Sequence, residues 1–195
     1  MKKALLIHGW LTEKEFYGPK FPTASNAHWF PWLSKQLMIR DIHAVAIEMP
    51  KCYYPEYEVW KRELERFELD ENTMLIGHSC GSGFLVRYLS GNDAPRVGKV
   101  VLAAPWLGII APPYDSEPFD QTFFEFDIDK NLAAKTAGVS LIYSVDDVPQ
   151  IQESVEILRS SIKNTKIIPL AGKGHLTFKE LGGPEFPEIL EEILS

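Results

Sequence analysis

Six short apolar runs alternate with amphipathic segments along the chain, and this alternation limits the possible folds more than any other feature. The runs lie at 3–9, 43–50, 73–79, 99–105, 139–145 and 165–172. Most of them are continuously apolar, as strands are when both faces of a parallel sheet are covered. The amphipathic segments have helical periodicity and lie at 28–40, 56–69, 81–90, 128–136, 149–162 and 184–195. This order predicts an open α/β sheet with right-handed crossovers.

The length of 195 residues is typical of a single domain, and we expect 1–195 to form one. The segment 105–127 departs from the alternation, because it is rich in proline and aromatic residues and too apolar for a solvent-exposed loop. A connection of more than about 15 residues without regular structure is usually functional. We therefore expect 105–127 to form a small lid or a pocket wall, with an ordinary packed loop as the alternative.

Charge and the length of the apolar runs argue against several classes of function. A formal net charge of −7 is unsuited to binding a nucleic-acid backbone. No apolar run approaches the roughly 20 residues of a membrane span, and the first run is too short for a signal peptide. The two cysteines, Cys52 and Cys80, are too few for a disulfide framework. The sequence therefore predicts a cytoplasmic protein with neither a nucleic-acid nor a membrane partner.

The stretch "GHSCG" at 77–81 lies between the third apolar run and the following helix, as a nucleophile elbow does. Glycines two residues before and after the serine let strand and helix approach closely, so that the hydroxyl projects above the sheet. The amides that begin the helix then favour a developing oxyanion. Ser79 is the expected nucleophile, and the neighbouring Cys80 thiol is expected to be a small buried side chain.

A serine hydroxyl needs an adjacent base to become a nucleophile, and the chain offers a histidine and a carboxylate in suitable positions. His175 follows the last apolar run, and Asp146 and Asp147 follow the fifth. Because the carboxyl ends of parallel strands meet at one edge of a sheet, these side chains are expected to converge on Ser79. Either aspartate can orient His175, and the other can cap the next helix. The remaining histidines are expected to pack, cap or lie on the surface: His8, His28, His43 and His78.

The oxyanion of such a site needs two converging backbone amides. One is expected from Cys80, directly after the nucleophile, and the other from Trp10, in the loop after the first strand. Aromatic side chains are expected to line the substrate pocket beside Trp10: Trp106, Tyr114, Phe119 and Phe123. No cluster has metal-ligand spacing and no glycine-rich phosphate loop is present, so neither a metal nor a cofactor is expected.

These motifs resemble those of the α/β-hydrolases, and in particular the small serine hydrolases of the retinoblastoma-binding protein 9 and YdeN type. The matching stretches are "LLIHGW", "EMP", "LIGHSCGS", "VVLAAP", "SVDD" and "GHLTF". The resemblance extends over nearly the whole chain. It implies a three-layer fold with a minimal six-stranded parallel sheet in the order 2-1-3-4-5-6, which lacks the first two strands of larger members.

The resemblance also implies a Ser/Asp/His triad, with Asp147, the second aspartate of "SVDD", as the carboxylate. It implies an esterase-like enzyme that cleaves a small ester, thioester or amide without a cofactor. Where the family has an aromatic residue after Gly-His, this chain has Leu176. The L-x-C-x-E motif of the vertebrate relative is absent, so a retinoblastoma partner is not expected. The alternative function is a binding or interaction module on the hydrolase scaffold, with enzymatic activity that is secondary to a protein or small-molecule partner.

Overall fold

The computed structural model describes residues 1–109 and 119–195, and six strands form one parallel sheet within them. The strands are β1 (Lys3–Ile7), β2 (His43–Ile47), β3 (Thr73–His78), β4 (Val100–Ala103), β5 (Val139–Ser144) and β6 (Thr165–Leu170). They lie in the order β2-β1-β3-β4-β5-β6, and every neighbouring pair is parallel. The predicted sheet and its strand order are confirmed.

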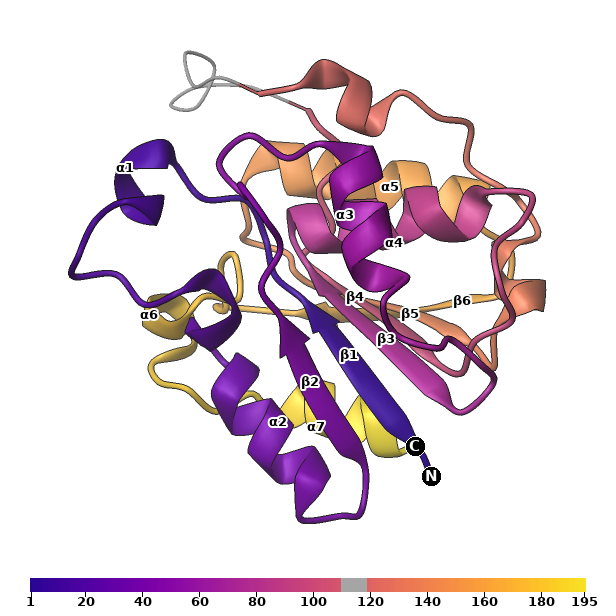
Figure 1. Cartoon of the computed structure of the whole chain (residues 1–195), viewed down its shortest axis with the longest axis horizontal. Coiled ribbons are helices and arrows are strands. Elements are labelled where there is room, and N and C mark those ends of the chain that lie inside the picture. Colours follow the sequence, from indigo (N-terminus) through magenta and orange to yellow (C-terminus); the bar gives the residue numbers. More distant parts are fainter. Residues whose placement is uncertain (110–118) are drawn as a thin grey trace.

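Helices cover the sheet on both faces, which gives the fold three layers (Figure 1). On one face lie α3 (Tyr57–Leu64), α4 (Cys80–Ser90) and α5 (Pro149–Ser161). On the other lie α2 (Phe30–Met38) and α7 (Pro187–Leu194). Two shorter helices, α1 (Glu13–Phe16) and α6 (Phe178–Leu181), lie in connections at the carboxyl edge of the sheet. This edge is where the predicted site residues meet.

Two hydrophobic cores, one on each face, explain why the strand sequences are continuously apolar. Successive side chains of a strand point to opposite faces. Leu5 of β1 packs in the core that contains Trp60 of α3, whereas Leu6 packs in the core that contains Phe30 of α2. Both faces are therefore removed from water, and an alternating polar position would leave a buried group without a partner.

The segment 128–136, which the sequence predicts as a helix, contains only a short 3₁₀ helix at Leu132–Lys135. The Asp129 carboxylate accepts a hydrogen bond of 2.9 Å from the Asn131 amide and forms a 2.8 Å ion pair with Lys135. Such a local side-chain bond competes with the hydrogen bonds of an α-helix at its first turn. The predicted helix is therefore wrong in type, because helical periodicity does not reveal this competition.

The two edges of the sheet are formed by β2 and β6. The β6 edge contains Pro169, which is paired in register with Tyr143 of β5. The amide of Val145 donates to the Leu170 carbonyl at 2.9 Å, so the hydrogen bonding between β5 and β6 continues past the proline. Pro169 is thus accommodated within an edge strand.

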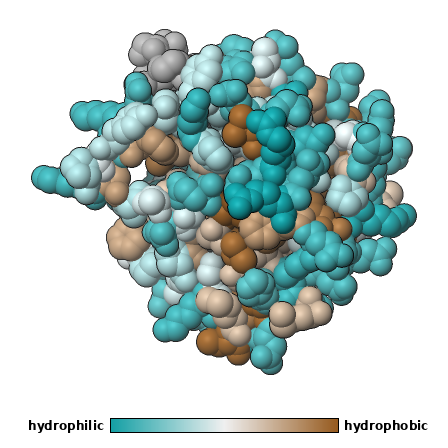
Figure 2. All heavy atoms as spheres, viewed as in Figure 1, coloured by the Kyte–Doolittle hydropathy of each residue, from teal (hydrophilic) through white to brown (hydrophobic). Residues whose placement is uncertain are grey.

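The outer surface seen in Figure 2 is mostly hydrophilic, because the amphipathic helices turn their polar sides outward. Hydrophobic residues gather on this face over the end of α2, where Met38 and Ile39 are 51% and 64% exposed. Within the described ranges, no helix has both the length and the apolar character needed to cross a bilayer.

Candidate active site

Ser79 occupies a sharp turn between β3 and α4, with φ 54° and ψ −119°. A non-glycine residue rarely adopts this backbone conformation, and the surrounding structure must impose it. A Cβ atom on Gly77 would lie 2.6 Å from the backbone of Ser82, and one on Gly81 would lie 2.3 Å from the Ile7 carbonyl oxygen. Both positions therefore require glycine, because a side chain would push strand and helix apart.

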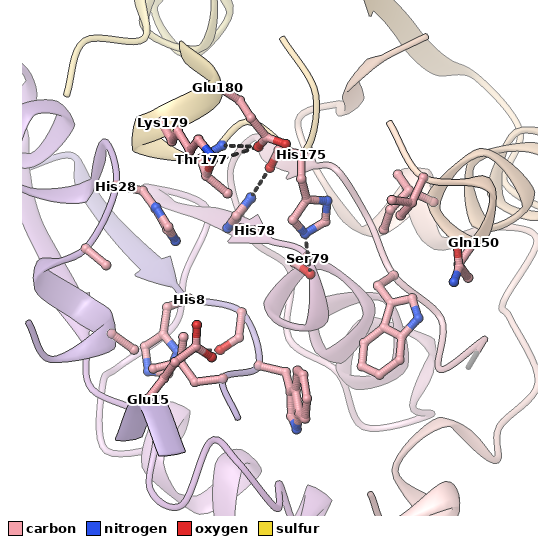
Figure 3. A pocket seen from close by; sticks show the side chains of 18 of the residues that line it. His8, Glu15, His28, His78, Ser79, Gln150, His175, Thr177, Lys179 and Glu180 are labelled. Atoms are coloured by element: carbon pink, nitrogen blue, oxygen red, sulfur yellow. Dashed lines mark hydrogen bonds between the residues drawn. The ribbon is translucent and has the colours of Figure 1, made fainter. Parts of the chain in front are cut away.

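A chain of hydrogen bonds connects Ser79 with a histidine and a buried carboxylate. His175 Nε2 lies 3.0 Å from Ser79 Oγ (Figure 3). The other ring nitrogen, His175 Nδ1, lies 2.9 Å from Asp147 Oδ2. The Asp147 side chain is only 1% exposed, and the Val148 amide donates to its Oδ1 at 2.7 Å. Because a carboxylate only accepts, His175 Nδ1 carries a proton and Nε2 is left to accept one from the serine. This arrangement can activate a serine hydroxyl.

The two neighbouring aspartates have different partners, which the sequence could not distinguish. Asp146 Oδ1 accepts from the Gly172 amide at 2.7 Å, and Oδ2 accepts from the Gly174 amide at 3.3 Å. The Ser144 hydroxyl also donates to Asp146, and this hydrogen bond is the main cause that lowers the pKa of the carboxyl group. Asp146 thus binds the backbone of the loop that carries His175, whereas Asp147 contacts the imidazole.

The loop after β1 passes directly beside Ser79. A Cβ atom on Gly9 would lie 3.0 Å from Ser79 Cβ. The Met49 amide donates to His8 Nε2 at 2.8 Å, so His8 Nδ1 carries the proton and donates to the Gly9 carbonyl at 2.8 Å. The carbonyl of Gly9 and the amide of Trp10 belong to one trans peptide and point in opposite directions. The ring of His8 therefore sets the direction of the Trp10 amide.

A cavity of about 450 Å³ lies over Ser79 and has two chemically different sides. Figure 3 shows polar side chains on one side of the serine, while Gln150 lies on the other. The polar side consists of His8, Glu15, His28, His78, Thr177, Lys179 and Glu180. The apolar lining consists of Trp10, Leu11, Ala24, Ala27, Trp106, Ile109, Phe119, Val148 and Ile151. In the part of the chain that the structure describes, no group of three or more His, Cys, Asp or Glu residues could hold a metal ion.

Of the aromatic residues predicted for the pocket, Trp10, Trp106 and Phe119 line it. The rings of Trp106 and Phe119 are in edge contact at 5.0 Å. Phe123 does not line the pocket: it is fully buried in the core, 5.2 Å from the Trp60 ring. The 3₁₀ helix at Gln121–Phe124 turns this side chain inward, which the sequence pattern did not indicate. Tyr114 and the middle of the expected lid, 110–118, lie outside the described residues.

Three histidines that the sequence assigned to packing or surface roles border the cavity. His78 is buried between His28 and His175, at ring distances of 5.6 and 5.2 Å. Burial lowers the pKa of His78 well below its ordinary value, and the nearby His175 and His28 rings lower it further. Burial also lowers the pKa values of His8 and His28. The sequence places His8 and His78 at the ends of strands beside the elbow, whereas nothing in the sequence pattern connects His28 with the site.

Cys80 lies fully buried at the start of α4. Burial raises the pKa of its thiol well above the ordinary value, so the thiolate that a nucleophilic cysteine needs is disfavoured. Its backbone amide belongs to the first turn of the helix, where amides have no acceptor within the helix. The backbone of Cys80, and not its side chain, is therefore the part suited to chemistry.

The fold and the site together define an α/β-hydrolase. The parallel sheet has the order 2-1-3-4-5-6, the serine lies on a strand-to-helix turn, and the acid and the histidine lie on later loops. Within this class, the chain belongs to the serine hydrolase family, whose sequence model matches residues 18–192. The chain therefore belongs to a family of hydrolases.

Comparison with known proteins agrees with this family. The chain is 33% identical over 106 residues to YdeN of Bacillus subtilis (strain 168), which is named as a hydrolase. This match covers 53% of the chain and spans only 50% of YdeN. The crystal structure of the B. subtilis ydeN gene product superposes with a TM-score of 0.80 at 22% identity, over 100% of this chain and 97% of that one. Est1E from Butyrivibrio proteoclasticus has a TM-score of 0.66 at 14% identity, with coverages of 99% and 86%. These two structural likenesses support the fold alone.

Proposed function

We propose that the protein hydrolyses a small ester, thioester or amide through an acyl-enzyme, as an esterase-like enzyme does. Ser79 is the nucleophile, His175 the general base and Asp147 the carboxylate that orients it. The observation that carries this proposal is the unbroken chain of hydrogen bonds from Asp147 through His175 to Ser79 at the wall of the cavity. Because Nε2 is the unprotonated nitrogen, His175 is in the tautomer that can accept the serine proton.

In the first step, His175 Nε2 takes the proton of Ser79 as Oγ attacks the substrate carbonyl carbon. The backbone amides of Trp10 and Cys80 donate hydrogen bonds to the oxyanion, and each is worth about 3 kcal/mol of barrier. His175 then protonates the leaving group as the acyl-enzyme forms. Water, deprotonated by the same histidine, repeats the attack and releases the acid.

The two sides of the cavity support a small amphipathic substrate. A volume of about 450 Å³ lies within the usual range of small-molecule sites. An apolar group fits along Trp10, Trp106 and Phe119, and a hydrogen-bonding group fits along His28 and Thr177. The free, buried state of both cysteines supports the further proposal of a reducing, cytoplasmic location.

Labelling with a fluorophosphonate probe, combined with turnover of p-nitrophenyl acetate, tests the proposed function. The wild-type protein should be labelled and should release p-nitrophenol, and both activities should be lost in Ser79→Ala. The variant Ser82→Ala is a matched control and should keep both labelling and turnover, because Ser82 lies in the first turn of α4 and its hydroxyl donates to the Ala103 carbonyl at 3.1 Å. Labelling that persists in Ser79→Ala would show that another residue is the nucleophile.

A further inference from the structure

The loop that carries His175 has an unusual backbone. Gly172, Gly174 and Leu176 have φ values of 68°, 46° and 58°, so three alternate residues lie in the left-handed region. Leu176 is the one non-glycine residue of the three, and this conformation is unfavourable for it. Its side chain is fully buried. The backbone next to His175 therefore needs partners that hold it in place.

Two buried rings supply these partners by donating to successive carbonyls. His78 Nε2 lies 2.9 Å from the His175 carbonyl oxygen, and Trp29 Nε1 donates to the Leu176 carbonyl at 3.1 Å (Figure 3 shows the first of these bonds). Trp29 is fully buried and His78 is 2% exposed. The two rings contact each other edge to face, with centroids 5.7 Å apart. They reach the loop from two separate elements, the end of β3 and the start of α2.

The two carbonyls belong to the peptide planes on either side of Leu176. The φ and ψ angles of Leu176 are the rotations between these planes, so fixing both carbonyls fixes its strained conformation. On the other side of His175, Asp146 accepts from the Gly172 and Gly174 amides. The backbone is thus held before and after the imidazole, which leaves the His175 side chain little freedom to move away from Ser79.

The protonation state of His78 makes its Nε2 a constant hydrogen-bond donor. A carbonyl oxygen only accepts, so Nε2 must carry the proton, and Nδ1 then has none. Nδ1 is buried and has no hydrogen-bond partner among the described residues. A buried unpaired nitrogen is unfavourable, and the bond from Nε2 to His175 is the polar interaction that compensates for it. Burial, together with the charges on His175 and His28, lowers the pKa of His78, so it stays neutral when His175 becomes protonated.

We propose that His78 and Trp29 are positioning residues that hold the His175 imidazole against Ser79 by binding the carbonyls of His175 and Leu176. This inference rests on the proposed function, in which His175 is the base. Displacing a reacting group by about 1 Å can cost about 100-fold in rate. Neither ring lies between the reacting atoms, so their loss should lower kcat and leave KM nearly unchanged.

The test compares variants that remove one donor each and keep an aromatic ring. His78→Phe and Trp29→Phe should each lower kcat for p-nitrophenyl acetate by about 10- to 100-fold with little change in KM. His78→Gln, which keeps an N–H donor, should restore kcat to within about fivefold of wild type. Phe186→Leu is the packing control, because Phe186 is fully buried and contacts the Trp29 ring at 5.7 Å. It should lower Tm without lowering kcat.

A second readout does not depend on turnover. The proton of His175 Nδ1, hydrogen-bonded to Asp147, should give a low-field resonance in the wild-type NMR spectrum, and this resonance should broaden or disappear in His78→Phe and Trp29→Phe. A wild-type protein without labelling or turnover would overturn the proposed function, while this resonance would still report on the positioning. The inference is overturned if both donor variants keep the wild-type kcat and resonance. It is also overturned if they only lower Tm and leave kcat unchanged, as Phe186→Leu should. Should His78→Phe not fold, Trp29→Phe decides the question by the same criteria.

Discussion

Replacing Asp147 by asparagine tests the proposed triad at its most buried side chain. The Val148 amide donates to Asp147 Oδ1 at 2.7 Å, so the oxygen of an asparagine at this position must stay on that amide. The asparagine NH2 group then takes the place of Oδ2, 2.9 Å from His175 Nδ1. Because this group is a donor, Nδ1 must accept, and the imidazole proton moves to Nε2. Nε2, 3.0 Å from Ser79 Oγ, can no longer take the serine proton.

The size of the effect follows from this forced tautomer. The corresponding change in Ser-His-Asp enzymes lowers kcat by about 10⁴-fold, or about 5.4 kcal/mol of barrier. Water cannot substitute for the carboxylate here, because the Asp147 side chain is only 1% exposed. We therefore expect a loss of about 10³- to 10⁴-fold in kcat with p-nitrophenyl acetate, a similar slowing of fluorophosphonate labelling, and little change in KM.

Asp146→Asn is the matched control, since it makes the same chemical change one residue earlier. The asparagine keeps an oxygen for the Gly172 amide at 2.7 Å and loses only the longer bond of 3.3 Å to Gly174. The kcat of the Asp146→Asn variant should fall by no more than about tenfold. The reasoning is refuted if Asp147→Asn retains kcat within about threefold of wild type at unchanged Tm, or if Asp146→Asn is the more damaging change.

Three further changes test other parts of the structure. Gly81→Ala should prevent folding or lower Tm strongly, because the new Cβ would lie 2.3 Å from the Ile7 carbonyl oxygen. Thermal melting followed by circular dichroism measures this change, and a wild-type Tm would contradict the prediction. Cys80→Ala should keep kcat within about threefold, since only the backbone of Cys80 is used, and a loss of labelling would contradict this. Burial opposes the charge of Glu192, but hydrogen bonds from Lys166 and Ser140 outweigh burial and lower its pKa. The carboxylate therefore adds stability above its ordinary pKa, and this stability is lost as pH falls through the lowered pKa. Glu192→Gln should flatten the acid side of a plot of Tm against pH, and an unchanged slope would contradict the assignment.

The sheet and the elbow could be predicted from sequence because local patterns determine them. Continuous apolar runs indicate strands covered on both faces. Gly77 is required by contacts within the elbow and Gly81 by the close approach of β1, and both glycines belong to a recognisable five-residue motif. The meeting of Ser79 with His175 followed from the rule that parallel strands end at one edge. These features depend on spacing, which the sequence contains directly.

The remaining features depend on side-chain direction and distant contacts, which spacing does not contain. Asp146 and Asp147 both follow β5, and only the course of the backbone decides which one reaches the imidazole. His28 and His78 are 50 positions apart and meet only in the folded chain. Phe123 looked like a pocket residue because its neighbours are aromatic, but its side chain turns into the core.

The proline in β6 has a consequence for how molecules of this protein meet one another. Along a strand, consecutive residues direct their backbone amides and carbonyls to opposite sides. Leu170 accepts from Val145 and so faces β5, which means that Pro169 faces away from the sheet at its open edge. A strand from another molecule would find no amide donor at that position. Pro169 thus protects the edge of the sheet against strand addition and aggregation, at a position where its missing N–H costs the fold nothing.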